Sequence, residues 1–326
     1  MRILKAVSLL VVSLAASAAG VQAQTVQATI NYPQGVSAVA VDYIANHAYV
    51  LLPGYLSNGA TAVQVLEGSN NSVLRTFQVP VSNAIAVNVV TGTLYIGGSE
   101  STATGSESVV VAVSPKTGAV IATIPISSTP GFGVVALAID PLTDRVFVSN
   151  ASDNAITVIN GKTNTVSASV PLGGQVPAGI AVNFLTCTVY AALNDNQVAI
   201  LSEKTDKVTF ATYGSQTSGI AVDPFFAREY VTDGVFSSPT VGVLDHKGAT
   251  EASVAVGLFP QGIDVDFVTS QVFVANEADG TLSKIDEQSD SVVNTIPVDV
   301  NSVVVNPRES TVYAVGSTSV TVLTEN

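Results

Sequence analysis

The chain of 326 residues has one cysteine, no tryptophan and two histidines. The single cysteine, Cys187, excludes an internal disulfide. Because its neighbours in FLTCTVYA are mainly apolar, we expect it in a strand, as a small buried hydrophobe rather than a reactive thiol. Only His47 and His246 could act as the histidine base that activates a serine or cysteine in a catalytic site. The patterns GxSxG, HExxH, CxxC and a phosphate-cradling glycine loop are also missing from the sequence. We therefore assign no catalytic residue.

Basic residues are scarce. The 12 lysines and arginines face 25 aspartates and glutamates, which gives a formal net charge of −13. Such a chain repels nucleic-acid phosphates and anionic lipid headgroups. We therefore expect no nucleic-acid partner.

The N-terminus has the pattern of an export signal. MRILK carries two positive charges and leads into the apolar stretch VSLLVVSLAASAAGV, which ends before Gln22-Ala23. We expect residues 1–23 to be a cleaved signal peptide. The alternative is a membrane anchor, but the apolar stretch is shorter than the roughly 20 residues that span a bilayer. Cleavage predicts a secreted chain, periplasmic or at the cell surface, with no membrane insertion.

What the sequence has in abundance is alternating Val, Ala, Thr and Ser. Val and Thr favour strands because their branched side chains are stiff. No long stretch shows apolar residues at helical spacing. We therefore predict an all-β protein, with residues 24–326 forming a single domain.

A repeat divides this domain into seven units. An Asp or Asn after a short apolar run serves as the anchor of each unit, and an aromatic residue follows it at a fixed distance of seven positions. The anchors are Asp42, Asn88, Asp140, Asn183, Asp223, Asp266 and Asn306, and the aromatics are Tyr49, Tyr95, Phe147, Tyr190, Tyr230, Phe273 and Tyr313. Successive anchors are 40 to 52 residues apart, which is the length of a four-stranded propeller blade.

The end of the chain predicts how the ring closes. The last unit stops at VTVLTEN after its third strand, and TVQATINYP at the start resembles the missing fourth strand. Pairing the two would leave no open edge. We predict a seven-bladed β-propeller, its ring closed by the N-terminal strand that completes the last blade.

These units resemble a known family. FVSN at 147–150, YVTD at 230–233 and FVAN at 273–276, each followed by a polar turn, are similar to the repeats of the YVTN-repeat β-propellers, which include the YncE-like proteins. The long inserts at 51–62 and 97–108 depart from that pattern. The resemblance implies the propeller fold and an exported protein rather than a particular chemistry.

The anchors are best explained as turn residues. Three of them precede proline, which favours a type I turn with the side-chain oxygen bonded to the turn's own backbone. The acidic and amide-rich loops after the second strands offer weak metal candidates, namely Asp153, Asp195 and Asp279. Calcium takes six to eight oxygens, but none of these loops matches a calcium-loop pattern. We expect solvated turns and no cofactor, with calcium as the alternative.

The strongest candidate for a binding site is one face of the ring. In a propeller, the connections from the fourth strand to the next first strand, and from the second to the third, share one face. These connections contain the repeated segments NYPQG (31–35) and LFPQG (258–262), TPGFG (129–133) and the inserts. The residues that we assign to ligand or partner binding are Tyr32, Gln34, Tyr55, Phe132, Phe236, Phe259 and Gln261. Exposed aromatics among polar residues suit a sugar, a peptide or a protein, but each aromatic could instead pack onto a neighbouring blade.

We therefore expect a monomeric, non-catalytic binding or scaffold propeller that recognises a protein, peptide or glycan of the cell envelope. Two alternatives stay open: a metal-assisted hydrolase or lactonase at the channel mouth, and a surface-layer or adhesion component.

Overall fold

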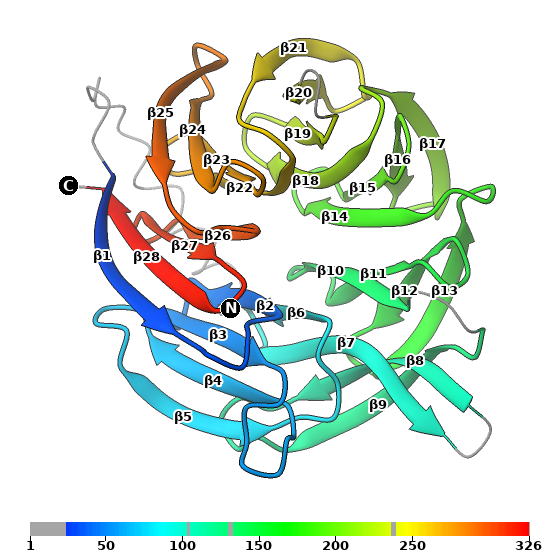
Figure 1. Cartoon of the computed structure of the whole chain (residues 1–326). Coiled ribbons are helices and arrows are strands. Elements are labelled where there is room, and N and C mark those ends of the chain that lie inside the picture. Colours follow the sequence, from blue (N-terminus) through cyan, green and yellow to red (C-terminus); the bar gives the residue numbers. More distant parts are fainter. Residues whose placement is uncertain (1–23, 103–104, 130–132, 236–238, 326) are drawn as a thin grey trace.

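The structure, a computed structural model, describes residues 24–102, 105–129, 133–235 and 239–325. These residues form seven four-stranded antiparallel sheets, arranged as blades around a central axis (Figure 1). The predicted all-β fold and the predicted seven blades are confirmed. Within the described ranges, no helix is long and apolar enough to cross a membrane.

The blades are numbered in the chain order of their first strands, and the first strand of each blade is the innermost. Blade 1 contains β2 (Ala38–Asp42), β3 (His47–Leu52), β4 (Ala62–Glu67) and β5 (Val73–Gln78). Blade 2 contains β6 (Ala84–Asn88), β7 (Thr93–Thr102), β8 (Gly105–Val113) and β9 (Val120–Ser127). Blade 3 contains β10 (Val134–Asp140), β11 (Arg145–Asn150), β12 (Ala155–Asn160) and β13 (Thr165–Pro171). Blade 4 contains β14 (Pro177–Asn183), β15 (Thr188–Leu193), β16 (Gln197–Ser202) and β17 (Lys207–Thr212).

The remaining blades follow the same order. Blade 5 contains β18 (Thr217–Asp223), β19 (Arg228–Asp233), β20 (Thr240–Asp245) and β21 (Thr250–Ala255). Blade 6 contains β22 (Pro260–Asp266), β23 (Gln271–Asn276), β24 (Thr281–Asp286) and β25 (Ser291–Pro297). Blade 7 contains β26 (Ser302–Asn306), β27 (Thr311–Val315) and β28 (Ser319–Glu325), with β1 (Gln24–Asn31) as its outermost strand.

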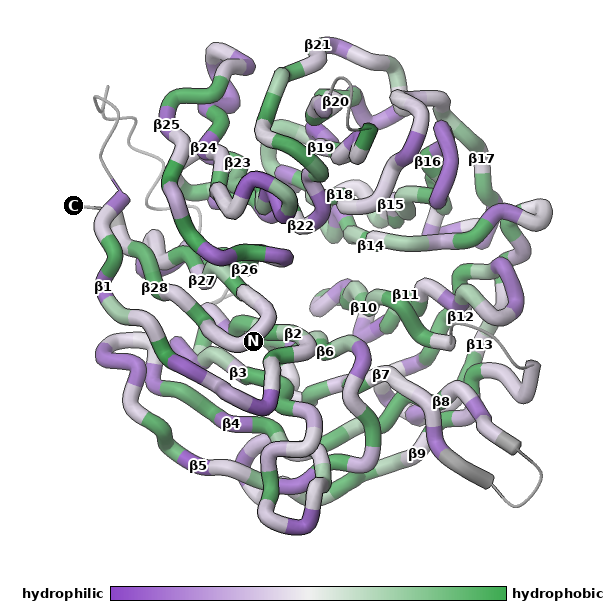
Figure 2. The backbone as a smooth tube through the Cα atoms, in the orientation of Figure 1, coloured by the Kyte–Doolittle hydropathy of each residue, from purple (hydrophilic) through white to green (hydrophobic). Residues whose placement is uncertain are grey.

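The core lies between the blades. Seven apolar clusters are present, and each one joins residues of two neighbouring blades. The repeated aromatics are at most 2% exposed. In five blades the residue paired with the aromatic on the first strand is alanine, which leaves room for the ring. Hydrophobic residues accordingly lie mostly within strands and hydrophilic ones mostly at the connections (Figure 2).

The anchors form the turns that join first and second strands. In blade 3, Oδ1 of Asp140 accepts hydrogen bonds from the N–H groups of Leu142 at 2.7 Å and Thr143 at 3.2 Å. The other anchors make the same bonds, except that Asn306 makes the first one alone. This confirms that the anchors serve the turns.

The same turn corrects the expectation for Cys187. The residue four positions after each anchor has a positive φ in all seven blades, and in blade 4 this residue is Cys187, with φ 56°. Cys187 therefore lies in a turn and is half-buried, rather than in a strand as a buried hydrophobe. Of its apolar neighbours, Phe184 and Leu185 belong to the same turn, and residues 189–191 belong to β15, so apolar composition alone did not locate the strand.

The N-terminal strand closes the ring, as predicted. β1 pairs with β28 over its whole length, from Gln24 opposite Glu325 to Asn31 opposite Ser319. Beyond the strand, the N–H of Tyr32 donates to the carbonyl of Thr318 at 2.7 Å. Figure 1 shows β1 along the outside of blade 7, far in sequence from the strand that it covers.

Deleting residues 24–31 should lower the melting temperature strongly and cause self-association. The deletion removes a ladder of hydrogen bonds, each contributing about 1 kcal/mol, and exposes the edge of β28. Calorimetry and gel filtration measure both effects. Adding the peptide QTVQATIN should restore melting, and a scrambled peptide should not. Unchanged melting of the deletion variant would contradict this closure.

Ala227→Asn should stabilise the protein by about 1 kcal/mol. Ala227 has φ 52°, a conformation that asparagine adopts far more readily than alanine. Chemical denaturation measures the gain. The control is Ala45→Asn, because Ala45 lies one position before the left-handed residue Asn46 of blade 1, where no gain is expected.

Candidate functional site

The connections of the ring form two distinct faces. Connections from the fourth strand to the next first strand meet those from second to third strands, as where the N–H of Ala151 donates to the carbonyl of Gly133 at 3.0 Å. We call this side the loop face. The other connections meet on the opposite side, as where the N–H of Gly161 donates to the carbonyl of Asp144 at 2.8 Å. We call that side the turn face.

On the loop face, Tyr32 and Tyr55 come together. Their ring centroids are 6.5 Å apart, in an edge-to-face arrangement. The Tyr32 hydroxyl donates to Oε1 of Gln64 at 2.7 Å, and Nε2 of Gln64 donates to the Tyr55 hydroxyl at 3.4 Å. Tyr32 is 3% exposed, and this burial raises the pKa of its hydroxyl well above the usual range. Tyr32 therefore packs between blades 7 and 1, while Tyr55 stays half-exposed beside it.

The other predicted binding residues are dispersed. Gln34 is exposed. Phe259, in the connection between blades 5 and 6, and Gln261, near the start of β22, are half-buried. Phe259 has φ 54°, and its carbonyl accepts a hydrogen bond from the N–H of Glu277 at 3.1 Å. Phe132 and Phe236 lie outside the described residues. The structure thus brings Tyr32 and Tyr55 into contact but places Phe259 and Gln261 at another junction.

The insert at 97–108 is largely strand. It lengthens β7 and β8 into a hairpin that projects from blade 2 (Figure 1). Near the end of the hairpin, Glu100 pairs directly with Glu107 across the two strands. The hairpin therefore adds negative charge to the loop face.

The three candidate metal ligands are used locally. Asp153 Oδ1 accepts from the Ser127 hydroxyl at 2.7 Å and Oδ2 accepts from Nδ2 of Asn150 at 2.9 Å. Burial acts to raise the pKa of Asp153, but hydrogen bonds from Ser127 and Asn150 outweigh it and lower the pKa. Asp195 accepts from the N–H of Gln197 at 2.8 Å, and Asp279 from that of Leu258 at 2.6 Å. In the described part of the chain, no three His, Cys, Asp or Glu side chains are placed to share a metal ion.

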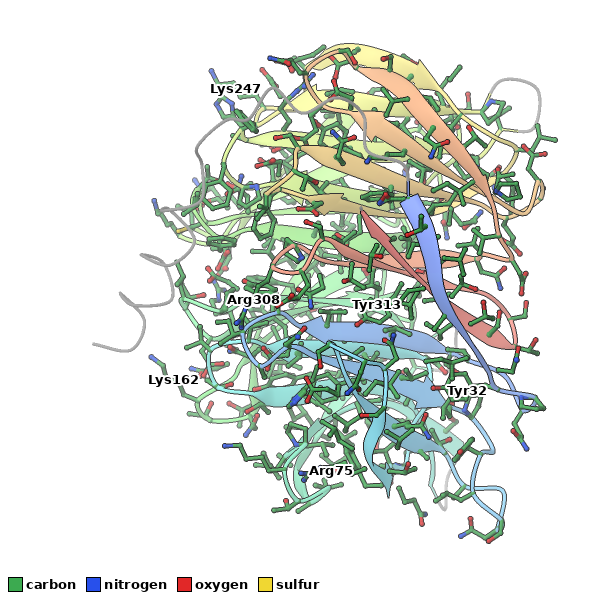
Figure 3. All side chains as sticks on the ribbon, turned by 90° about the vertical axis from the view of Figure 1, so that its left-hand side faces the viewer. Tyr32, Arg75, Lys162, Lys247, Arg308 and Tyr313 are labelled. Atoms are coloured by element: carbon green, nitrogen blue, oxygen red, sulfur yellow. The ribbon has the colours of Figure 1, made fainter. Side chains whose placement is uncertain are left out.

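Charge is separated between the two faces. None of the connections on the loop face contains Lys, Arg or His. They do contain acidic residues, of which Asp153, Glu277, Asp279 and Asp299 are exposed. Most of the described lysines and arginines lie instead in or beside the turn-face connections. Figure 3 shows Lys162, Lys247 and Arg308 on the opposite side of the ring from Tyr32.

A cavity of about 320 Å³ lies on the ring axis at the turn face. Side chains of the inner strands line it, and the residue that follows each anchor forms a collar at its mouth. The collar residues are Tyr43, Val89, Pro141, Phe184, Pro224, Phe267 and Pro307. Tyr43 and Phe267 meet edge-to-face, with centroids 6.3 Å apart. The mouth is therefore apolar and partly aromatic.

Three buried glutamates lie between blades near the turn face, in addition to the anchor aspartates. Glu203, Glu229 and Glu287 are 7%, 0% and 4% exposed. Burial, and then the charge of Asp140, raises the pKa of Glu203 to about 7. Burial raises the pKa of Glu229 to about 8. Burial, and then Asp223, raises the pKa of Glu287 to about 9.

The Glu203 and Glu287 carboxyls pair with anchor carboxyls. Glu203 faces Asp140, and Glu287 faces Asp223. Among the described residues, Oδ2 of Asp140 and Oδ2 of Asp223 have no hydrogen-bond partner. A proton kept by the facing glutamate, whose pKa is raised, gives each pair one donor between its two carboxyl groups. Arginines bind the same turns: Arg145 donates to Asp206 at 2.8 Å, and Arg228 donates to both oxygens of Asp290 at 2.9 and 2.8 Å.

Sequence reasoning missed these glutamates. Glu203 and Glu287 follow the third strand at the position where blades 1 and 3 have Gly68 and Gly161. Glu229 stands where blade 3 has Val146. Alignment of the units shows these departures from the repeat, and each one proves to be a buried carboxyl.

No protein-family model matches the chain, and no curated protein matches it significantly. The fold therefore rests on the structure, and the resemblance to YVTN-repeat propellers stays a prediction.

The buried glutamates should make the fold less stable as pH rises. The usual pKa of a glutamate is 4.5, and that of folded Glu287 is about 9. Between these values the unfolded chain releases a proton that the folded chain keeps, so stability falls with rising pH and levels off above about 9. Glu287→Gln, which stays neutral, should therefore melt progressively higher than the original protein as pH rises. Melting curves across this range measure it.

The control for this prediction is Glu277→Gln, because Glu277 is exposed on the loop face. Its melting temperature should differ from the original by the same amount at every pH. If the melting temperatures of Glu287→Gln and the original protein differ by the same amount at every pH, folded Glu287 does not keep its proton and the prediction is wrong.

Proposed function

We propose that this protein is an exported, non-catalytic binding propeller that captures a positively charged protein or peptide on its loop face. The export signal expected at residues 1–23 supports its location outside the cytoplasm. The ring supplies a rigid platform, and the loops supply the contacts.

The separation of charge carries this proposal. A face whose connections carry carboxylates and no Lys, Arg or His attracts a cationic partner and repels an anionic one. The exposed carboxylates of Glu277, Asp279 and Asp299 lie on connections within or between blades 6 and 7. Tyr55 and the exposed Gln34 belong to the next connections around the ring, near the junction of blades 7 and 1. The loop face therefore offers both negative charge and a half-exposed aromatic ring, as protein-binding surfaces commonly do.

The test uses residues 24–326 and two defined probes, a ten-lysine peptide and a ten-glutamate peptide. At low salt the lysine peptide should bind in calorimetry and the glutamate peptide should not. Binding should weaken steeply as salt rises, because exposed charges are screened. The triple variant Glu277→Gln, Asp279→Asn, Asp299→Asn should bind the lysine peptide several-fold more weakly.

The control variant is Glu67→Gln, Glu251→Gln, Glu309→Gln, which removes the same charge near the turn face. It should bind the lysine peptide as the original does. Equal losses in both variants would show that net charge alone attracts the peptide, and would overturn the assignment to the loop face. Gel filtration of the unmodified protein reports any self-association, which the surface-layer alternative requires.

A further inference from the structure

The cavity at the turn face contains one carboxylate among apolar side chains. Asp264 lies on β22, paired with the aromatic Phe273 of β23. At this position five blades have alanine and blade 7 has Val304. Among the described residues that line the cavity, Asp264 is the single one with a carboxylate, and none is a lysine, arginine or histidine. The repeat therefore needs no acid at this place.

The Asp264 carboxylate is held in a fixed position. Oδ1 accepts a hydrogen bond from its neighbour Val265 N–H at 2.9 Å, and Oδ2 accepts one from the N–H of Val305, in blade 7, at 2.8 Å. A carboxylate can accept about four hydrogen bonds, so it has capacity for a further donor. Asp264 also keeps contact with the channel interior, being only partly buried there.

None of the described residues that line the cavity gives this carboxylate a cationic partner. Burial, opposed by its two backbone hydrogen bonds and assisted slightly by Asp266, raises the pKa of Asp264 to about 6. At neutral pH it is thus mostly ionised in apolar surroundings, where an unpaired charge is costly. A cation that entered the cavity would offset that cost.

The lining indicates which kind of cation fits. Calcium takes six to eight oxygens, whereas the cavity side chains offer the two oxygens of Asp264 and the Tyr43 hydroxyl. Aromatic faces attract organic cations, and Tyr43, Phe184 and Phe267 stand in the collar. The volume of about 320 Å³ lies at the lower end of the range for small-ligand pockets.

We propose that the turn-face end of the channel binds an organic ammonium ion on an apolar body, with the ammonium group paired to the Asp264 carboxylate. The apolar body packs against the inner strands and the collar. This site is separate from the loop face and does not depend on the function proposed there.

The test is calorimetric titration of residues 24–326 with hexylammonium chloride at pH 7.5, with hexanol as the neutral match. Hexylammonium should bind and hexanol should bind at least about tenfold more weakly. Binding should also weaken below pH 6, because Asp264 becomes protonated while the ammonium stays charged.

Asp264→Ala should abolish binding of hexylammonium and keep the fold, since five blades already have alanine at this position. Asp264→Asn keeps the shape without the charge and should weaken binding at least about tenfold. The control Asp195→Asn, on the loop face, should leave binding unchanged. The proposal is overturned by unchanged binding in Asp264→Ala, by equal affinity for hexanol, by no binding at millimolar hexylammonium, or by calcium chloride displacing hexylammonium from the site.

Discussion

Each blade is apolar on both faces, so a blade is stable only when a neighbour covers each side. The seven inter-blade clusters satisfy this constraint, because each one consists of residues from two neighbouring sheets. A row of such sheets would end in two uncovered faces, and a ring has none. The closure of blade 7 by β1, the burial of the aromatics between blades and the alanines opposite them all serve this arrangement.

The repeated features of the fold were predictable because the sequence states them seven times. An anchor and an aromatic seven positions later are visible without an alignment. The turn is a local structure, and the contact of the aromatic with a neighbouring blade recurs in every unit. The position of β1 was also predictable, since the last unit lacked a strand that the N-terminus could supply. Residues that occur once were harder to place: Cys187 was taken for a strand residue, although it occupies the left-handed position of a turn.

The same reason limits what could be said of the candidate site. Whether Tyr32 is exposed depends on how blades 7 and 1 meet, and its hydroxyl is bonded to Gln64, 32 residues away. The buried glutamates and Asp264 break the repeat at single positions, and their surroundings come from a neighbouring blade. The sequence pattern of one unit does not predict contacts with the next blade. The surroundings of these glutamates and of Asp264 are therefore known only from the structure.

The pairing of β1 with β28 also determines when the ring can close during synthesis of the chain. The hydroxyl of Thr25 donates to the carbonyl of Thr324 across 299 positions of sequence, so this contact joins nearly the two ends of the described chain. A ribosome makes residues 24–31 before residues 319–325. Until β28 has been made, β1 has no partner in its own sheet, and the series of blades remains an open arc. Contacts of such long sequence separation form slowly, so the ring closes only after β28 has been made, and a chain interrupted anywhere before β28 cannot close it.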